Sequence, residues 1–263
     1  MNNLPLARSG SSALEVAVQA AEEAGKILLA HFGSEKEIRH KGKGNLVTKA
    51  DILSEKRIAE LLKLEYPDHN ILSEESNSST PVAGYTWIID PLDGTNNYVF
   101  GIPFFCTSIA LARDEDILLG VTYDPLRDEL FRAEEGHGTY LNDSAVQVSR
   151  EGSLGASLVG LDLGYSDDRG KELLAIAGGL RRQVHCLRII GSASLGLAYV
   201  ACGRITLYLH RCVYPWDIAG GLLLVREAGG TVTDWQGQPA SFDTKEIIVS
   251  NRELHQEFAG YLG

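Results

Sequence analysis

The sequence predicts an α+β / α/β fold, with an antiparallel sheet in its first half and a mixed sheet in its second. In the first half, two helical segments precede a run of alternating apolar and polar strands. In the second half, strands alternate with helices, which is typical of a mixed α/β sheet. The chain has 263 residues, enough for two packed subdomains. We place these at residues 1–149 and 150–263, because no long linker separates the halves.

Two helices are predicted near the start of the chain. Residues 12–32 begin with a capping-box pattern, Ser-x-x-Glu, and continue with apolar residues at helical spacing. A second helix is predicted for residues 51–64, with Thr48 or Asp51 as its cap. Residues 41–45 between them read as a flexible cationic loop, either a solvated connector or a mobile flap beside an anion.

The remaining elements are predicted from periodicity and turn residues. The apolar run 87–89 reads as a buried strand that stops at Pro91. Strands are also predicted for 71–73, 105–112, 117–123, 129–133, 138–142, 158–163, 184–190, 205–209, 231–234 and 246–249. Further helices are predicted for 171–180, 191–202 and 216–227.

The charge and the cysteines exclude several classes of protein. The formal net charge is −11, with acidic and basic residues scattered, whereas a partner such as nucleic acid or an anionic membrane requires a basic patch. Four separated cysteines suit small buried side chains in a reducing cytosol. The start of the chain lacks a signal peptide's apolar core, and no run is long enough to span a membrane. We therefore expect a cytoplasmic protein with a small-molecule substrate.

Acidic residues gather where predicted elements end. Asp90 and Asp93 flank the end of one predicted strand, Glu74 follows another, and Asp217 stands at a helix start. Such hard oxygen ligands suit Mg²⁺, and a cation would neutralise their mutual repulsion. The alternatives are a strand-to-loop turn for Asp90–Gly94 and a helix-start carboxylate for Asp217. Two or three bound Mg²⁺ ions could polarise a phosphoryl oxygen and activate a water molecule.

An ordered set of motifs resembles the inositol monophosphatase family of Mg²⁺-dependent, Li⁺-sensitive sugar-phosphate phosphatases. The motifs are LVTKAD at 46–51, SEES at 73–76, DPLDGTN at 90–96, GSA at 191–193 and WDIAG at 216–220. The resemblance covers nearly the whole chain. It implies a layered α-β-α-β-α fold, a homodimer, and hydrolysis of inositol monophosphate by direct attack of water without a covalent phospho-enzyme.

The resemblance also implies roles for individual residues. The implied metal ligands are Glu74, Asp90, the Leu92 carbonyl, Asp93 and Asp217. Thr95, oriented by Asp51, would act with Glu74 to activate the attacking water. The implied substrate-binding residues are Asp93, Gly94, Thr95, Gly191, Ser192, Ala193, His210 and Asp217.

One position departs from the inositol-specific pattern. His210 stands where those enzymes carry a Glu, seven residues before the metal-binding Asp217. His210 can still bond a hydroxyl group, while the adjacent Arg211 could accept a second phosphate. The alternatives to inositol monophosphate are therefore fructose bisphosphate, a nucleoside bisphosphate and histidinol phosphate. A catalytically silent, metal-binding regulatory protein is the non-enzymatic alternative.

Overall fold

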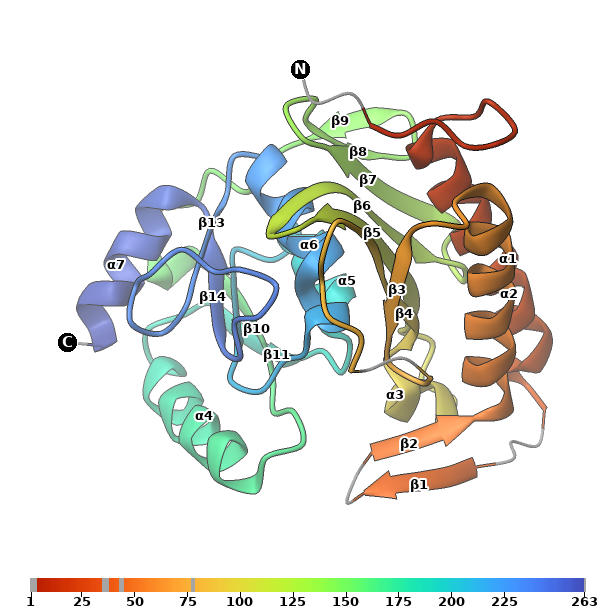
Figure 1. Cartoon of the computed structure of the whole chain (residues 1–263). Coiled ribbons are helices and arrows are strands. Elements are labelled where there is room, and N and C mark those ends of the chain that lie inside the picture. Colours follow the sequence, from red (N-terminus) through yellow and green to blue (C-terminus); the bar gives the residue numbers. More distant parts are fainter. Residues whose placement is uncertain (1–3, 35–37, 43–44, 77–78, 263) are drawn as a thin grey trace.

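The computed structural model describes the chain apart from residues 1–3, 35–37, 43–44, 77–78 and 263. It has five layers, helices alternating with sheets (Figure 1), which confirms the layered α-β-α-β-α prediction. The helices are α1 (Ala13–Phe32), α2 (Lys49–Glu65), α3 (Thr95–Val99), α4 (Asp167–Leu180), α5 (Ala193–Ala201), α6 (Pro215–Glu227) and α7 (Arg252–Leu262). Within the described residues, none of these helices has both the length and the apolar character needed to cross a membrane.

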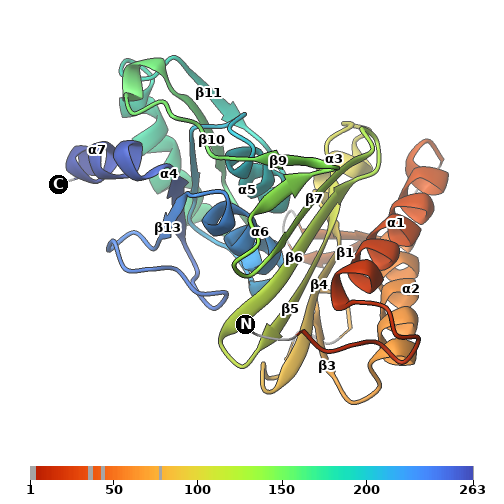
Figure 2. The same cartoon turned by 90° about the horizontal axis from the view of Figure 1, so that it is seen from above.

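The first sheet has seven strands in the order β3-β4-β5-β6-β7-β8-β9. They are β3 (Asn70–Ser73), β4 (Tyr85–Asp93), β5 (Cys106–Arg113), β6 (Asp116–Asp124), β7 (Glu129–Glu134), β8 (Thr139–Leu141) and β9 (Ser144–Val146). Every neighbouring pair is antiparallel except β3 and β4, so the prediction of an antiparallel half holds apart from its parallel edge strand. Helices α1 and α2 cover one face of this sheet (Figure 2).

The second sheet has five strands in the order β11-β10-β12-β14-β13. They are β10 (Leu158–Asp162), β11 (Cys186–Ile189), β12 (Leu207–His210), β13 (Thr231–Thr233) and β14 (Ile247–Ser250). Two pairs are parallel and two antiparallel, which confirms the mixed sheet. Helices α4 and α7 pack on its outer face, while α5 and α6 lie between the two sheets.

Helix α6 approaches the first sheet closely because both contribute a glycine at the contact. A Cβ atom added at Gly120 on β6 would lie 2.5 Å from the backbone oxygen of Gly220 on α6. The large core between the sheets draws residues from both halves, such as Ile88 of β4, Leu222 of α6 and Val249 of β14. We propose to retain the division into 1–149 and 150–263, because β9 ends at Val146 and β10 begins at Leu158.

Several predicted boundaries were wrong. Strand β4 continues through Pro91 to Asp93, because its pairing with β5 tolerates a register break between Asp90 and Asp93. The Pro91 carbonyl accepts a hydrogen bond from the Thr107 hydroxyl at 3.0 Å, so this stretch stays attached to β5. Residues 41–42 and 45 of the predicted loop 41–45 lie instead in two paired strands of a hairpin.

That hairpin consists of β1 (Ile38–Gly42) and β2 (Asn45–Thr48), and residues 43–44 of the predicted loop lie outside the described residues. Strand β9, the short helix α3 and helix α7 were not predicted. Helix α7 had a signal in the sequence, since Asn251 caps it by accepting the Leu254 N–H at 2.9 Å.

Replacing Gly120 with Ala should destabilise the protein, because the new methyl group would meet backbone atoms that cannot move aside. We expect a loss of about 1–3 kcal/mol in the free energy of unfolding, measured by urea denaturation. The control is Gly178→Ala in α4, where an added Cβ meets nothing within 4 Å. The control should be neutral or stabilising by up to about 1 kcal/mol. Equal effects of the two substitutions would contradict the close contact.

Candidate active site

The four predicted acidic residues lie close enough for their charges to act on one another. Glu74 follows β3, Asp90 and Asp93 lie at the end of β4, and Asp217 lies in the first turn of α6. Asp90 is 1% exposed. Burial raises its pKa well above the usual value, and the negative charges of Glu74, Asp93 and Asp217 raise it further. The four carboxylates therefore share one electrostatic environment.

The Asp93 carboxylate lies at the start of helix α5. It accepts hydrogen bonds from the Ser194 N–H at 2.7 Å, the Ser192 hydroxyl at 2.5 Å and the Ala193 N–H at 3.3 Å. Burial raises its pKa, and these hydrogen bonds oppose that rise. The 191–193 segment thus contacts a predicted metal ligand directly, as well as lining the same cavity.

The Asp217 carboxylate also lies at a helix start. It accepts the Tyr214 N–H at 2.7 Å in the first turn of α6, so the alternative structural role considered for Asp217 is present in the fold. Burial and the charges of Asp93 and Glu74 raise the pKa of Asp217 well above its usual value. The Lys245 ammonium group opposes this rise, and nothing in the sequence patterns identified Lys245 as part of the site.

Asp51 links helix α2 to Thr95. One carboxylate oxygen of Asp51 accepts the Thr48 N–H at 2.8 Å and the Thr48 hydroxyl at 2.5 Å, which caps the helix. The other oxygen lies 3.1 Å from the Thr95 hydroxyl, which is also 2.9 Å from the Leu92 carbonyl oxygen. The capping role and the contact to Thr95 are thus compatible, because each uses a different oxygen.

Asp162 is a site residue that the sequence patterns did not identify. It is buried at the end of β10, where it accepts the Gly191 N–H at 2.5 Å, the Ile190 N–H at 3.0 Å and the Tyr208 hydroxyl at 2.6 Å. Burial raises the pKa of Asp162 to about 7. The signal available in the sequence was the position of Asp162, a single acidic residue near the end of a predicted apolar strand. Its partners come from distant segments, so the sequence could not show what it holds.

All eight predicted substrate-binding residues line a single cavity of about 210 Å³. They are Asp93, Gly94, Thr95, Gly191, Ser192, Ala193, His210 and Asp217. Asn96, Asp162, Leu163, Gly164, Tyr165, Ile189 and Cys212 complete the lining. Among the described residues that line it, none is a lysine or an arginine.

His210 offers this cavity a neutral ring. Its Nδ1 atom accepts the Cys212 N–H at 3.1 Å, which assigns the proton of the neutral imidazole to Nε2. Burial lowers the pKa of His210 to about 3, so the ring stays uncharged at physiological pH. His210 can therefore donate one hydrogen bond without adding positive charge.

Arg211 does not serve the cavity, and the prediction that it could accept a second phosphate was wrong. Its guanidinium group lies 2.7 Å from a carboxylate oxygen of Glu172 and 3.0 Å from one of Glu246. The same group stacks 4.5 Å from the centre of the Trp235 ring. The guanidinium group of Arg211 is therefore already engaged by two carboxylates and an aromatic ring.

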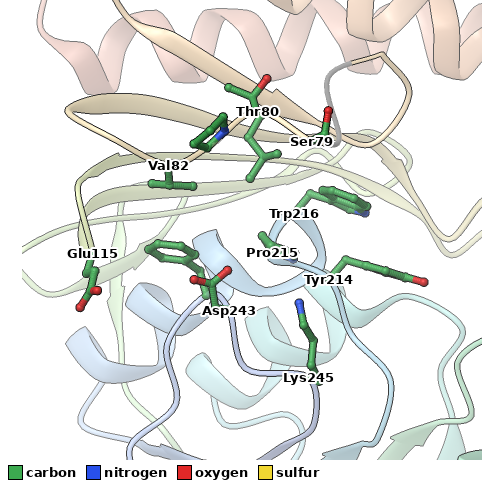
Figure 3. A pocket seen from close by; sticks show the side chains of 12 residues that line it. Ser79, Thr80, Val82, Glu115, Tyr214, Pro215, Trp216, Asp243 and Lys245 are labelled. Carbon is green, nitrogen blue, oxygen red and sulfur yellow. The ribbon is translucent and has the colours of Figure 1, made fainter.

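A larger cavity, of about 590 Å³, lies beside the first turn of α6 (Figure 3). Its walls are formed by residues 79–82 and 214–216 and by Leu72, Glu115, Phe242, Asp243 and Lys245. It contains none of the predicted site residues. Its connection with the acidic site is through α6, since Tyr214, Pro215 and Trp216 directly precede Asp217 (Figure 3).

In the part of the chain that the structure describes, no three acidic, histidine or cysteine side chains already converge as a metal centre. Both Asp93 and Asp217 have a carboxylate oxygen that accepts a backbone N–H at a helix start. The donor set itself is suited to a hard cation, since it consists of carboxylates and a carbonyl. Buried like charges also favour a cation among them.

Together, the layered fold and the buried carboxylates beside a Thr–Asp pair define a phosphatase, a hydrolase of phosphate esters. The model of the inositol monophosphatase family matches residues 10–262. The chain therefore belongs to the inositol monophosphatase family, which is generally metal-dependent.

Individual relatives agree with this assignment. "Inositol monophosphatase 1" of Solanum lycopersicum is 39% identical, with 96% of each chain covered. "Fructose-1,6-bisphosphatase/inositol-1-monophosphatase" of Thermotoga maritima is 36% identical, with 93% of each covered. The crystal structure of the extragenic suppressor protein suhB from Bartonella henselae superposes with a TM-score of 0.89. It is 36% identical and covers 96% of this chain and 98% of that one.

The raised pKa of Asp162 predicts a pH-dependent contribution to stability. Its folded-state pKa of about 7 exceeds the ordinary value of about 3.9, so the folded protein binds more protons in that window. Its contribution is greatest at low pH and is lost as the pH rises toward 7. Relative to Asp162→Asn, the unfolding free energy of the wild type should fall by about 2 kcal/mol between about pH 5 and about pH 7.5.

Urea denaturation of the two proteins in chelator at both pH values measures this difference. The Asn variant is the matched control, because every other titrating group is common to both proteins. A difference in stability that does not change with pH would contradict the assignment.

Proposed function

We propose that this protein is a Mg²⁺-dependent phosphomonoesterase that hydrolyses inositol monophosphate, such as myo-inositol 1-phosphate, to inositol and phosphate. The observation that carries the proposal is one cavity lined by Asp93, Asp217 and Thr95, with Asp51 holding Thr95 and with the charges of Glu74, Asp93 and Asp217 acting on the buried Asp90. The name of the Solanum lycopersicum relative supports the substrate.

The metal ligands in this proposal are the carboxylates of Glu74, Asp90, Asp93 and Asp217 and the carbonyl group of Leu92. Two or three Mg²⁺ ions would polarise the phosphate ester and lower the pKa of a bound water. The strongly raised pKa values of Asp90 and Asp217 support a cation here, because neighbouring negative charges contribute to both rises. Li⁺ is expected to inhibit by taking one cation position.

The other roles belong to residues around the acids. Asp51 orients the Thr95 hydroxyl, Thr95 and Glu74 would hold the attacking water, and the Glu74 carboxylate would accept its proton. The N–H groups of Gly94 and Thr95 receive the phosphate. Gly94 has a φ of +94°, and a Cβ added there would lie 3.0 Å from the Phe104 carbonyl oxygen, so this backbone turn requires glycine.

The lining of the cavity favours an uncharged, hydroxylated group over a second phosphate. His210 contributes a neutral donor, and no described lysine or arginine lines the cavity. Fructose bisphosphate remains the second candidate because the Thermotoga maritima relative carries both names. A nucleoside bisphosphate would meet the same lack of a cation. Histidinol phosphate would need a free carboxylate for its amine, and both oxygens of Asp162 already accept hydrogen bonds.

The non-enzymatic alternative is a silent metal-binding regulatory protein. The buried hydrogen bond between Thr95 and Asp51 supports the enzyme instead, because metal binding alone does not require it. The proposal retains a homodimer, from the resemblance, and a cytoplasmic location, from the four scattered cysteines.

Asp93→Asn should lower phosphate release from inositol monophosphate by about 100-fold or more, because it removes a ligand charge, and loss of even an outer partner of a metal ligand costs about 10- to 100-fold. Colorimetric phosphate assays with and without Mg²⁺ measure this, and circular dichroism checks the fold. Asp143→Asn, at an exposed turn, is the control and should be indistinguishable from wild type. Turnover at the wild-type rate in the Asp93 variant would refute the proposed site.

A substrate panel tests whether the lack of a lining lysine or arginine sets the substrate preference. We expect kcat/KM for inositol monophosphate to exceed that for fructose 1,6-bisphosphate, nucleoside bisphosphates and histidinol phosphate by about tenfold or more, equivalent to about 1.4 kcal/mol. His210→Ala should raise KM for inositol monophosphate about 2- to 10-fold, the value of one neutral hydrogen bond. Hydrolysis of p-nitrophenyl phosphate, which has no hydroxyl groups to bind, is the control. A preference for bisphosphates would instead support the second candidate.

A further inference from the structure

We propose that Glu55 is a positioning residue for the metal site: its buried carboxylate fixes the segment that carries Glu74. This inference rests on the proposed function, because it takes Glu74 to be a Mg²⁺ ligand. Glu55 belongs to helix α2 and lies outside the motifs that the sequence analysis singled out.

The contacts of Glu55 are specific. One carboxylate oxygen accepts the backbone N–H of Glu75 at 2.9 Å, and the other accepts the hydroxyl group of Ser76. Glu55 is 5% exposed, although Ser76 itself lies at the surface. A buried carboxylate is costly unless donors surround it, and both donors here come from the residues directly after Glu74.

Helix α2 presents Asp51 and Glu55 on one face, because residues four apart lie one above the other on a helix. Asp51 reaches the Thr95 hydroxyl, and Glu55 reaches the segment after Glu74. The same helical turn therefore sets the positions of the two groups proposed to hold the attacking water. Their spacing is fixed by one rigid element.

Glu74 depends on such an anchor because it lies where the chain leaves the sheet. Strand β3 ends at Ser73, and the Glu74 N–H makes a long hydrogen bond of 3.4 Å to the Ile89 carbonyl oxygen of β4. The two bonds to Glu55 follow within the next two residues. Glu74 is thus held from the strand on one side and from α2 on the other. Hydrogen bonds to a charged acceptor are the stronger kind, so Glu55 restricts this segment more than a neutral residue would.

The test is a calorimetric titration of the purified, full-length protein with Mg²⁺, alongside phosphate release at increasing Mg²⁺. Glu55→Ala should weaken Mg²⁺ binding about 10-fold, the lower end of the loss seen when a group bonded to a metal ligand is removed, because Glu55 bonds the two residues after Glu74 and not Glu74 itself. Ser76→Ala, which removes one of the two donors, should weaken it to a smaller extent. Glu55→Gln can still accept one hydrogen bond, so its affinity should lie between those of Glu55→Ala and the wild type.

The matched control is Glu60→Ala on the same helix. The Glu60 side chain is 53% exposed. The ion pairs that the structure describes for it, to Lys56 and Arg57, are long, at 3.8 Å each. This variant should bind Mg²⁺ with the wild-type constant. Thermal unfolding of every variant separates a loss of metal affinity from a loss of fold, and excess Mg²⁺ should restore much of the lost rate.

The outcomes distinguish this inference from the proposed function. If the wild type binds Mg²⁺ and Glu55→Ala and Ser76→Ala bind it equally well, Glu55 does not position the site and the inference is overturned. If Glu55→Ala does not fold, Ser76→Ala decides the matter, because its side chain is at the surface. A wild type that binds Mg²⁺ but releases no phosphate from any substrate overturns the proposed function, while the titration still tests Glu55. A wild type that binds no Mg²⁺ overturns both.

Discussion

The structure depends on burying several carboxylates of the same charge at one place. Asp90, Asp93 and Asp217 all have raised pKa values, because burial removes water from each carboxylate. The negative charges of neighbouring acids raise the pKa values of Asp90 and Asp217 further. The fold offsets part of this cost with oriented backbone groups. The start of α5 donates to Asp93 and the start of α6 donates to Asp217, where the N–H groups and the helix dipole favour negative charge. The remaining repulsion is what a bound cation would remove.

The stacking of the five layers places the acidic residues of β4 beside the first turns of α5 and α6. Helices α5 and α6 lie between the two sheets, and the contact between Gly120 and Gly220 lets α6 approach β6 at backbone distance. The acids at the end of β4 thereby meet the first turns of both helices. On the opposite face of the first sheet, α2 supplies Asp51 and Glu55, which extend the polar network into the outer layer. The site is held from two layers at once.

Local patterns were sufficient for most elements and for the motif residues. Capping residues at Ser12 and Thr48 and the alternation along β5 and β6 act over a few residues, so their outcome can be read locally. The prediction that the strand stops at Pro91 was wrong. A proline usually ends a strand, but here a register break and the hydrogen bond from Thr107 accommodate it. The prediction that Arg211 could accept a second phosphate was wrong because its carboxylate partners, Glu172 and Glu246, lie far away in the sequence.

The sequence by itself determined which residues are available: the acids at element ends, Thr95 after a glycine, and a His in place of a Glu at position 210. Only the tertiary structure decided what each of them faces. It placed Asp162 under the Gly191 segment, Lys245 near Asp217, and Glu55 against the residues after Glu74. These contacts join segments 20 or more residues apart. Their energies depend on burial and on partner geometry, neither of which exists before the layers have packed.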